Sequence, residues 1–88
     1  MRDAERIAKE RAHVALADAL STAVGELNGY FDREHSVLAG KIMRAAADEE
    51  RREIAADMRA NDRLKMRIHE AIQRGSLARK ALAELTDV

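Results

Sequence analysis

The sequence predicts an all-α fold, a long antiparallel helical hairpin followed by one or two shorter C-terminal helices. Three observations support this prediction. Alanine, the strongest helix former, accounts for 18 of the 88 residues. Proline is absent, and only four glycines interrupt the chain. Apolar residues recur every three or four positions over most of its length, which is the spacing of one face of a helix.

The first helix is expected over residues 3–27. Asp3 is suited to cap its N-terminus, and Glu5 places a negative charge in the positively polarised first turn. Asn28 and Gly29 are expected to end the helix, because glycine readily takes the left-handed conformation of a helix C-terminus. The apolar side of this helix consists of Ile7, Val14, Leu16, Leu20, Ala23, Val24 and Leu27.

Three further helices are expected after this break, over residues 32–59, 62–74 and 76–86. The boundary at Asn61 follows from a slip in the phase of the apolar pattern, and Gly75 marks the next one. The slip also fits a bend in one longer helix, and the periodicity does not separate the two alternatives. All four helices are assigned to a single domain, residues 1–88.

Small residues suggest how the hairpin closes. Residues 45–47 are three consecutive alanines, and the first helix offers a matching series of small side chains. Alanine contributes little buried area, and a chain of this size is marginally stable alone. We therefore expect two copies to associate into a dimeric helical bundle. The series in the first helix is Ala4, Ala8, Ala12, Ala15 and Ala19.

Composition excludes several classes of function. Without cysteine, the chain has no disulfide, no cysteine-ligated zinc and no thiol chemistry. It has no glycine-rich phosphate loop and no credible Ser-His-Asp set, so we expect no enzyme, no cofactor and no metal. No apolar stretch is long enough to span a membrane, and none follows Met1 as in a signal peptide. We therefore expect a cytoplasmic protein that does not bind membranes.

These features favour a small, non-enzymatic module for protein–protein interaction, such as an adaptor, a chaperone-like subunit or a regulatory or inhibitory accessory protein. Its size and helicity are typical of bacterial or phage accessory proteins. The partner-binding candidates are the only two aromatic residues, expected at the tip of the hairpin, and two methionines, whose flexible side chains suit adaptable surfaces. These candidates are Tyr30, Phe31, Met43 and Met58.

A second hypothesis is a nucleic-acid-associated regulator, because residues 59–80 carry a net charge of +5 in a chain whose formal net charge is zero. The alternative is that these basic side chains pair with the acidic segment 45–58, whose net charge is −3. The candidate phosphate-binding residues are Arg59, Arg63, Lys65, Arg67, Arg74, Arg79 and Lys80.

A third hypothesis centres on histidine. Glu10 and His13 form a Glu-x-x-His pair that resembles the metal-binding pair of ferritin-like diiron bundles. His35 resembles the histidine of the phosphotransfer motif, although Leu38-Ala39 stands where that family has Lys-Gly. These resemblances imply a metal-binding or phospho-relay helical bundle as a further alternative.

Overall fold

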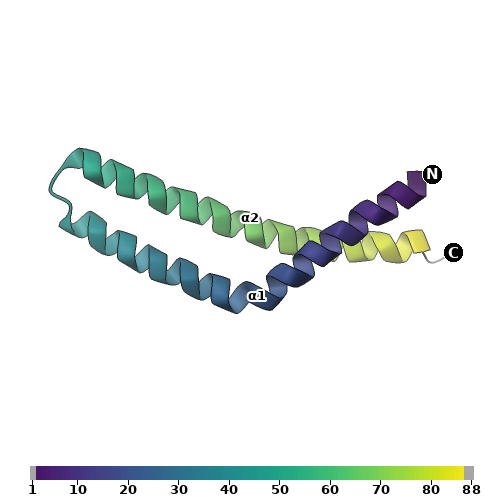
Figure 1. Ribbon diagram of the computed structural model, residues 1–88. Coiled ribbons are helices and arrows are strands. Elements are labelled where there is room, and N and C mark those ends of the chain that lie inside the picture. The colour runs from purple at the N-terminus through teal and green to yellow at the C-terminus, as the bar shows by residue number, and fades with distance from the viewer. Residues whose placement is uncertain (1, 87–88) are drawn as a thin grey trace. The chain divides into compact units, whose positions relative to one another are not determined.

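The structure is a computed structural model that describes residues 2–86. Two helices make up almost all of this chain. Helix α1 spans Arg2–Arg44 and helix α2 spans Asp48–Thr86, and residues 45–47 connect them (Figure 1). The described residues contain no strand. The all-α helical hairpin expected from the sequence is therefore confirmed, but its turn lies elsewhere in the chain.

The turn lies where the charge of the sequence changes sign. Lys41 and Arg44 occupy the last turn of α1, and Asp48, Glu49 and Glu50 occupy the first turn of α2. Basic groups at a helix C-terminus and acidic groups at an N-terminus both interact favourably with the helix dipole. Arg51 also donates a hydrogen bond of 2.9 Å from Nη1 to Oδ1 of Asp48. Charge therefore marks both helix ends, with no glycine or proline between them.

The break predicted at Asn28 and Gly29 was wrong, because α1 continues through both residues. No glycine among the described residues has a positive φ, so none forms a left-handed helix end. A glycine inside a helix costs about 1 kcal/mol relative to alanine. Burial of one large apolar side chain contributes about 1.5–3 kcal/mol. Phe31 and Leu38, both buried, follow in α1 and offset the cost.

The boundary predicted at Gly75 was also wrong, and of the two alternatives left open at Asn61 the structure has the one longer helix. Helix α2 is continuous from Asp48 to Thr86, so the segments expected at 62–74 and 76–86 are parts of one helix. Asn61 lies half-buried within it. Gly75 serves a different purpose: a Cβ built on it would lie 2.1 Å from the Cβ of Ala17. This residue permits close contact between helices instead of ending one.

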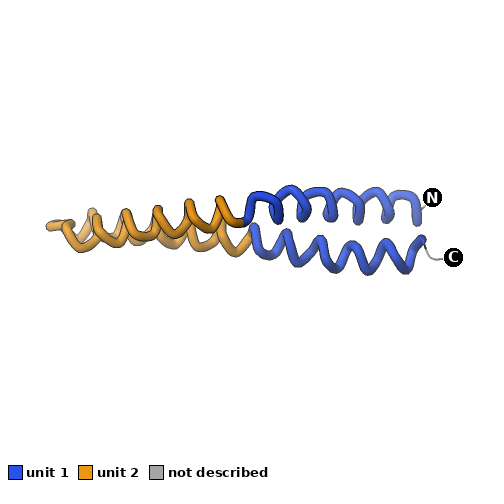
Figure 2. The backbone as a smooth tube through the Cα atoms, turned by 90° about the horizontal axis from the view of Figure 1, so that it is seen from below, with its two compact units in different colours: residues 1–24, 68–88 blue, residues 25–67 orange. Residues whose placement is uncertain are grey.

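The chain divides into two compact units, coloured separately in Figure 2. Unit 1 contains residues 2–24 of α1 together with 68–86 of α2, and unit 2 contains residues 25–67. Each unit is a pair of packed helical segments. Neither α1 nor α2 has, within the described residues, an apolar stretch that could cross a membrane.

The two units have different interiors. In unit 2, Leu38, Ala45 and Ile54 form a buried cluster against which Ile42 and Met58 pack. In unit 1, the most buried apolar side chains are alanines, Ala17 and Ala78. The alanine seam predicted from the sequence therefore involves other residues. Of the alanines expected to form it, only Ala45 is buried, and the exposed ones are Ala4, Ala8, Ala12, Ala15, Ala19, Ala46 and Ala47.

Candidate functional site

The two aromatic residues that the sequence placed at a loop lie in different environments in the structure. Tyr30 and Phe31 both lie within α1, with ring centroids 5.7 Å apart and planes at 71°. Phe31 is only 6% exposed, whereas Tyr30 is 49% exposed. Consecutive side chains leave a helix about 100° apart, so one ring faces the interior of unit 2 and the other faces solvent. The expectation that the pair lies at the hairpin tip was wrong.

The two candidate methionines also differ in environment. Met58 packs against the buried cluster of unit 2. Met43 lies near the end of α1 and, at 86%, is the most exposed large apolar residue among those described. Phe31 and Met58 thus belong to the interior of unit 2, while Tyr30 and Met43 are available on its surface.

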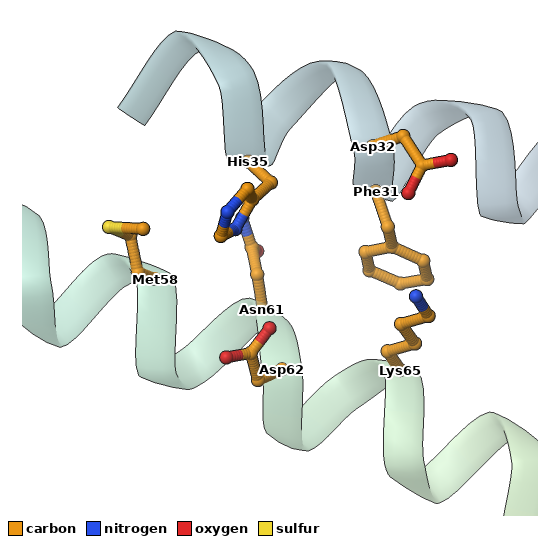
Figure 3. A pocket seen from close by; sticks show the side chains of 7 residues that line it. All are labelled: Phe31, Asp32, His35, Met58, Asn61, Asp62 and Lys65. Atoms are coloured by element: carbon orange, nitrogen blue, oxygen red, sulfur yellow. The ribbon is translucent and has the colours of Figure 1, made fainter. Parts of the chain in front are cut away.

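A groove of about 270 Å³ opens between the two helical segments of unit 2 (Figure 3). Phe31, Asp32 and His35 line it from α1. Four residues of α2 line the other side, namely Met58, Asn61, Asp62 and Lys65. Carboxylates, an imidazole, an amide and an ammonium group therefore surround an aromatic ring and a thioether. This mixture suits a single side chain of a partner, with its apolar part on Phe31 and Met58 and a polar end at the rim.

A second depression, of about 260 Å³, lies on α2 within unit 2 and is lined by Ala60, Arg63, Leu64 and Arg67. Their spacing of three, four and seven residues places all four on one side of the helix. Arg59 is one turn away and is exposed, as are Arg63 and Arg67. None of these three arginines forms an ion pair within the described chain.

The other basic candidates are placed differently. In unit 1, Arg74 donates a hydrogen bond of 3.0 Å from Nη2 to Oε1 of Glu10, and Arg79 forms an ion pair with Asp18. Both partners lie in α1, not in the acidic segment 45–58. Lys80 is exposed in unit 1, and Lys65 lines the groove of unit 2.

Arg52 was not identified from the sequence, and Glu10 was singled out only as part of a Glu-x-x-His pair. Arg52 lies seven residues before Arg59, so the two share the outer side of α2 in unit 2. Within the described part of the chain, Glu10 is the one buried charged residue, and its Oε2 atom has no hydrogen-bond partner. In both cases the sequence holds a signal, because residues seven apart lie on the same side of a helix. Arg52 is seven residues from the candidate Arg59, and Glu10 is seven residues from Ala17.

The histidines do not form a metal centre within the described residues. No group of three His, Cys, Asp or Glu side chains there could hold a metal ion. His13 and Glu10 both lie in unit 1, and the carboxylate of Glu10 binds Arg74. His35 is exposed at the rim of the unit 2 groove, and no specific contact favours a phospho-relay.

Comparison with family models, curated proteins and solved structures finds no match for this chain.

Proposed function

We propose that this protein is a small, non-enzymatic interaction module, of the adaptor, chaperone-like or regulatory kind, that binds a partner through helical faces. One observation is central to this proposal. Among the residues that the structure describes, six apolar side chains are buried and three of these are alanine, whereas seven large apolar side chains are exposed. The exposed residues are Leu16, Tyr30, Val37, Met43, Leu64, Met66 and Leu77.

The accessible area supports the same proposal. The chain exposes 6836 Å². A compact monomer of 9.8 kDa is expected to expose about 5,200 Å². The excess of roughly 1,600 Å² per chain is about twice the roughly 800 Å² that each partner buries in a standard protein–protein interface. Two copies that each buried this excess would share about 3,200 Å² in total, an area typical of obligate homodimers.

The two depressions also favour contact with a partner over chemistry on a substrate. Their volumes, about 270 and 260 Å³, lie just below the lower end of the roughly 300–1,000 Å³ typical of small-molecule sites. Each is suited to a single side chain projecting from another protein. Tyr30, Phe31, Met43 and Met58 remain the proposed contact residues. Tyr30 and Met43 are exposed on the surface of unit 2, and Phe31 and Met58 line its groove.

Thermal unfolding over a range of protein concentrations tests this proposal. If the exposed apolar faces complete their core by association, the midpoint of unfolding rises with concentration. Substituting Leu16→Gln and Leu77→Gln lowers that midpoint at high concentration, because both side chains are about half exposed in the single chain. Ser76→Gln, a neighbouring exposed position, is the matched control. A stable monomer with a concentration-independent midpoint overturns the proposal.

A nucleic-acid-associated regulator is the second candidate function. The observation that favours it is a strip of exposed arginines on α2 in unit 2 that form no ion pair with any described residue, namely Arg59, Arg63 and Arg67, extended by Arg52. Arginines on one side of a helix suit phosphate oxygens, and their release of counterions makes such binding strongly salt-dependent.

Fluorescence anisotropy with labelled duplex DNA and single-stranded RNA tests the second candidate. Micromolar binding at low salt that weakens steeply as salt is added supports it. The double variant Arg63→Glu, Arg67→Glu then abolishes binding, whereas Arg51→Glu, at an arginine already paired with Asp48, changes it little. The absence of binding at low salt excludes this function.

A further inference from the structure

The depression on α2 has the composition of a coiled-coil hole. Ala60, Arg63, Leu64 and Arg67 occupy positions i, i+3, i+4 and i+7. In knobs-into-holes packing, one side chain of a facing helix inserts between four residues with this spacing. Ala60 has a small side chain, and Leu64 is 49% exposed. The depression therefore has an apolar floor between two arginines and no occupant within its own unit.

Tyr30 lies on the same side of unit 2 as this depression. Asp32 and Asp62 both line the groove on one side of the unit (Figure 3). Side chains two residues apart in a helix point about 200° away from each other. Tyr30 and Leu64, each two residues from one of these aspartates, therefore project on the side opposite the groove. Val37 is 48% exposed and lies seven residues after Tyr30, on the same stripe of α1.

Tyr30 is also level with the depression along the helix pair. Phe31 lines the groove together with Asn61 and Lys65, which sets the register of α1 against α2 in this unit. By that register Tyr30 stands opposite Leu64. A two-fold axis parallel to the helices would thus bring the Tyr30 of each copy over the depression of the other at the same time. Such mutual contact is what a symmetric dimer requires.

We propose that a second copy of this chain docks face to face on unit 2, with Tyr30 of each copy in the Ala60–Arg63–Leu64–Arg67 depression of the other. This inference rests on the proposed function as an interaction module and specifies one of its partners. Segments of α1 and α2 from the two copies then lie antiparallel, as in a four-helix bundle. The tyrosine ring stacks between two guanidinium groups, an arrangement that cation–π attraction favours.

The charges near the turn complement each other in this arrangement. The same register places Lys41 level with Glu53 and Arg44 level with Glu50. In the dimer the basic end of α1 in one copy faces the acidic start of α2 in the other. All four side chains are exposed, and none of them forms an ion pair within the described chain. They are therefore available to a second copy.

Mixed disulfide formation tests the proposed contact directly, because the chain has no cysteine of its own. Two single variants, Tyr30→Cys and Leu64→Cys, are mixed and oxidised with copper phenanthroline. We expect a disulfide between the two different variants, which only an intermolecular contact can produce. The control mixture is His35→Cys with Asp62→Cys, two positions on the groove side of the same unit, and it should remain uncrosslinked.

Sedimentation equilibrium measures what the contact contributes. We expect Tyr30→Ala to raise the dimer dissociation constant at least about thirty-fold, the effect typical of an aromatic anchor residue. Ala60→Leu, which fills the depression, should weaken the dimer as well. Ser36→Ala, at an exposed position of α1 that lines neither depression, is the matched control and should leave the constant unchanged. Circular dichroism confirms that each variant keeps its helices.

Negative results in these experiments separate a failure of the proposed dimer surface from a failure of the proposed interaction function. The proposed surface is wrong if Tyr30→Ala leaves the dimer dissociation constant unchanged and the cysteine variants form no mixed disulfide. The proposal of an interaction module is not affected by that result. A chain that remains monomeric at every concentration also overturns the proposed surface. In that case the proposed function as an interaction module is retained only if the monomer is unstable alone. A stable monomer overturns both proposals.

Discussion

Unit 1 and unit 2 are both pairs of helical segments, but different side chains hold them together. Unit 2 buries large apolar groups, with Phe31, Leu38 and Ile54 at most 8% exposed. Unit 1 buries Ala17 and Ala78 and brings Gly75 against the first of these. Its helices are also joined by two ion pairs, Glu10–Arg74 and Asp18–Arg79, whereas no ion pair joins the helices of unit 2 within the described chain.

This difference shows two ways in which a thin helical pair can be stabilised. Large side chains remove apolar area from water, which contributes about 25 cal/mol per Å². Small side chains contribute less area but allow backbones to approach, so that many weak dispersion contacts form. We therefore expect unit 2 to be sensitive to the removal of volume and unit 1 to its addition.

The largest effect is expected from Phe31→Ala in unit 2. The ring is 6% exposed, and its removal leaves a cavity between α1 and α2. Truncations of this kind cost about 3–5 kcal/mol of unfolding free energy. Chemical denaturation followed by circular dichroism measures the loss. Ser36→Ala, at an exposed position of the same helix, is the control, and a loss for Phe31→Ala below about 1 kcal/mol would contradict the assignment of this ring to the core.

The next largest change in unfolding free energy is expected when volume is added to unit 1. Gly75→Val introduces a Cβ whose position lies 2.1 Å from the Cβ of Ala17, so the helices must separate. Overpacking of this kind costs about 1–3 kcal/mol. Gly25→Val is the matched control, because a Cβ at Gly25 meets nothing within 4 Å. Equal effects of the two variants in denaturation would show that the close contact in unit 1 does not form.

Helix content could be predicted from this sequence, but the position of the turn could not. Gly29 and Gly75 are strong local stop signals, and tertiary packing overrides both. The true turn at residues 45–47 contains only alanine, which favours helix. Its one sequence signal is the change from Lys41 and Arg44 to the acidic run that begins at Asp48, and dipole effects of this size are too weak to outweigh a glycine in a local reading.

The candidate site was harder to predict because it depends on the register between the helices. With a turn at residues 45–47, Gly75 faces Ala17 and Arg74 reaches Glu10. No local pattern specifies those pairs, since they follow only from where the chain reverses. The exposure of the α2 arginines and of Tyr30 does not depend on the position of the turn. Exposure is set mainly by the face that a residue occupies within one helix.

A smaller effect, of opposite sign, is expected from Glu10→Leu in unit 1. The Glu10 side chain is 7% exposed, and one of its oxygens has no partner. Arg74 is 41% exposed, so water can hydrate it after the pair is lost. Replacing a buried charge with an apolar group of similar size is therefore expected to leave the unfolding free energy unchanged or to raise it by about 1 kcal/mol. Denaturant titration measures the change, and a loss above about 2 kcal/mol would show that this ion pair stabilises unit 1.

The smallest effect is expected from the second ion pair of unit 1. The side chains of Asp18 and Arg79 are 60% and 58% exposed, so water screens their attraction and both lose conformational freedom on pairing. A double-mutant cycle with Asp18→Ala and Arg79→Ala is expected to give a coupling energy below about 0.5 kcal/mol that decreases further at high salt. A coupling above about 1 kcal/mol would change the contrast between the units, because charge would then hold unit 1 together as strongly as its small side chains do. A coupling near zero instead leaves the contact at Gly75 and Ala17 as the feature on which this unit depends.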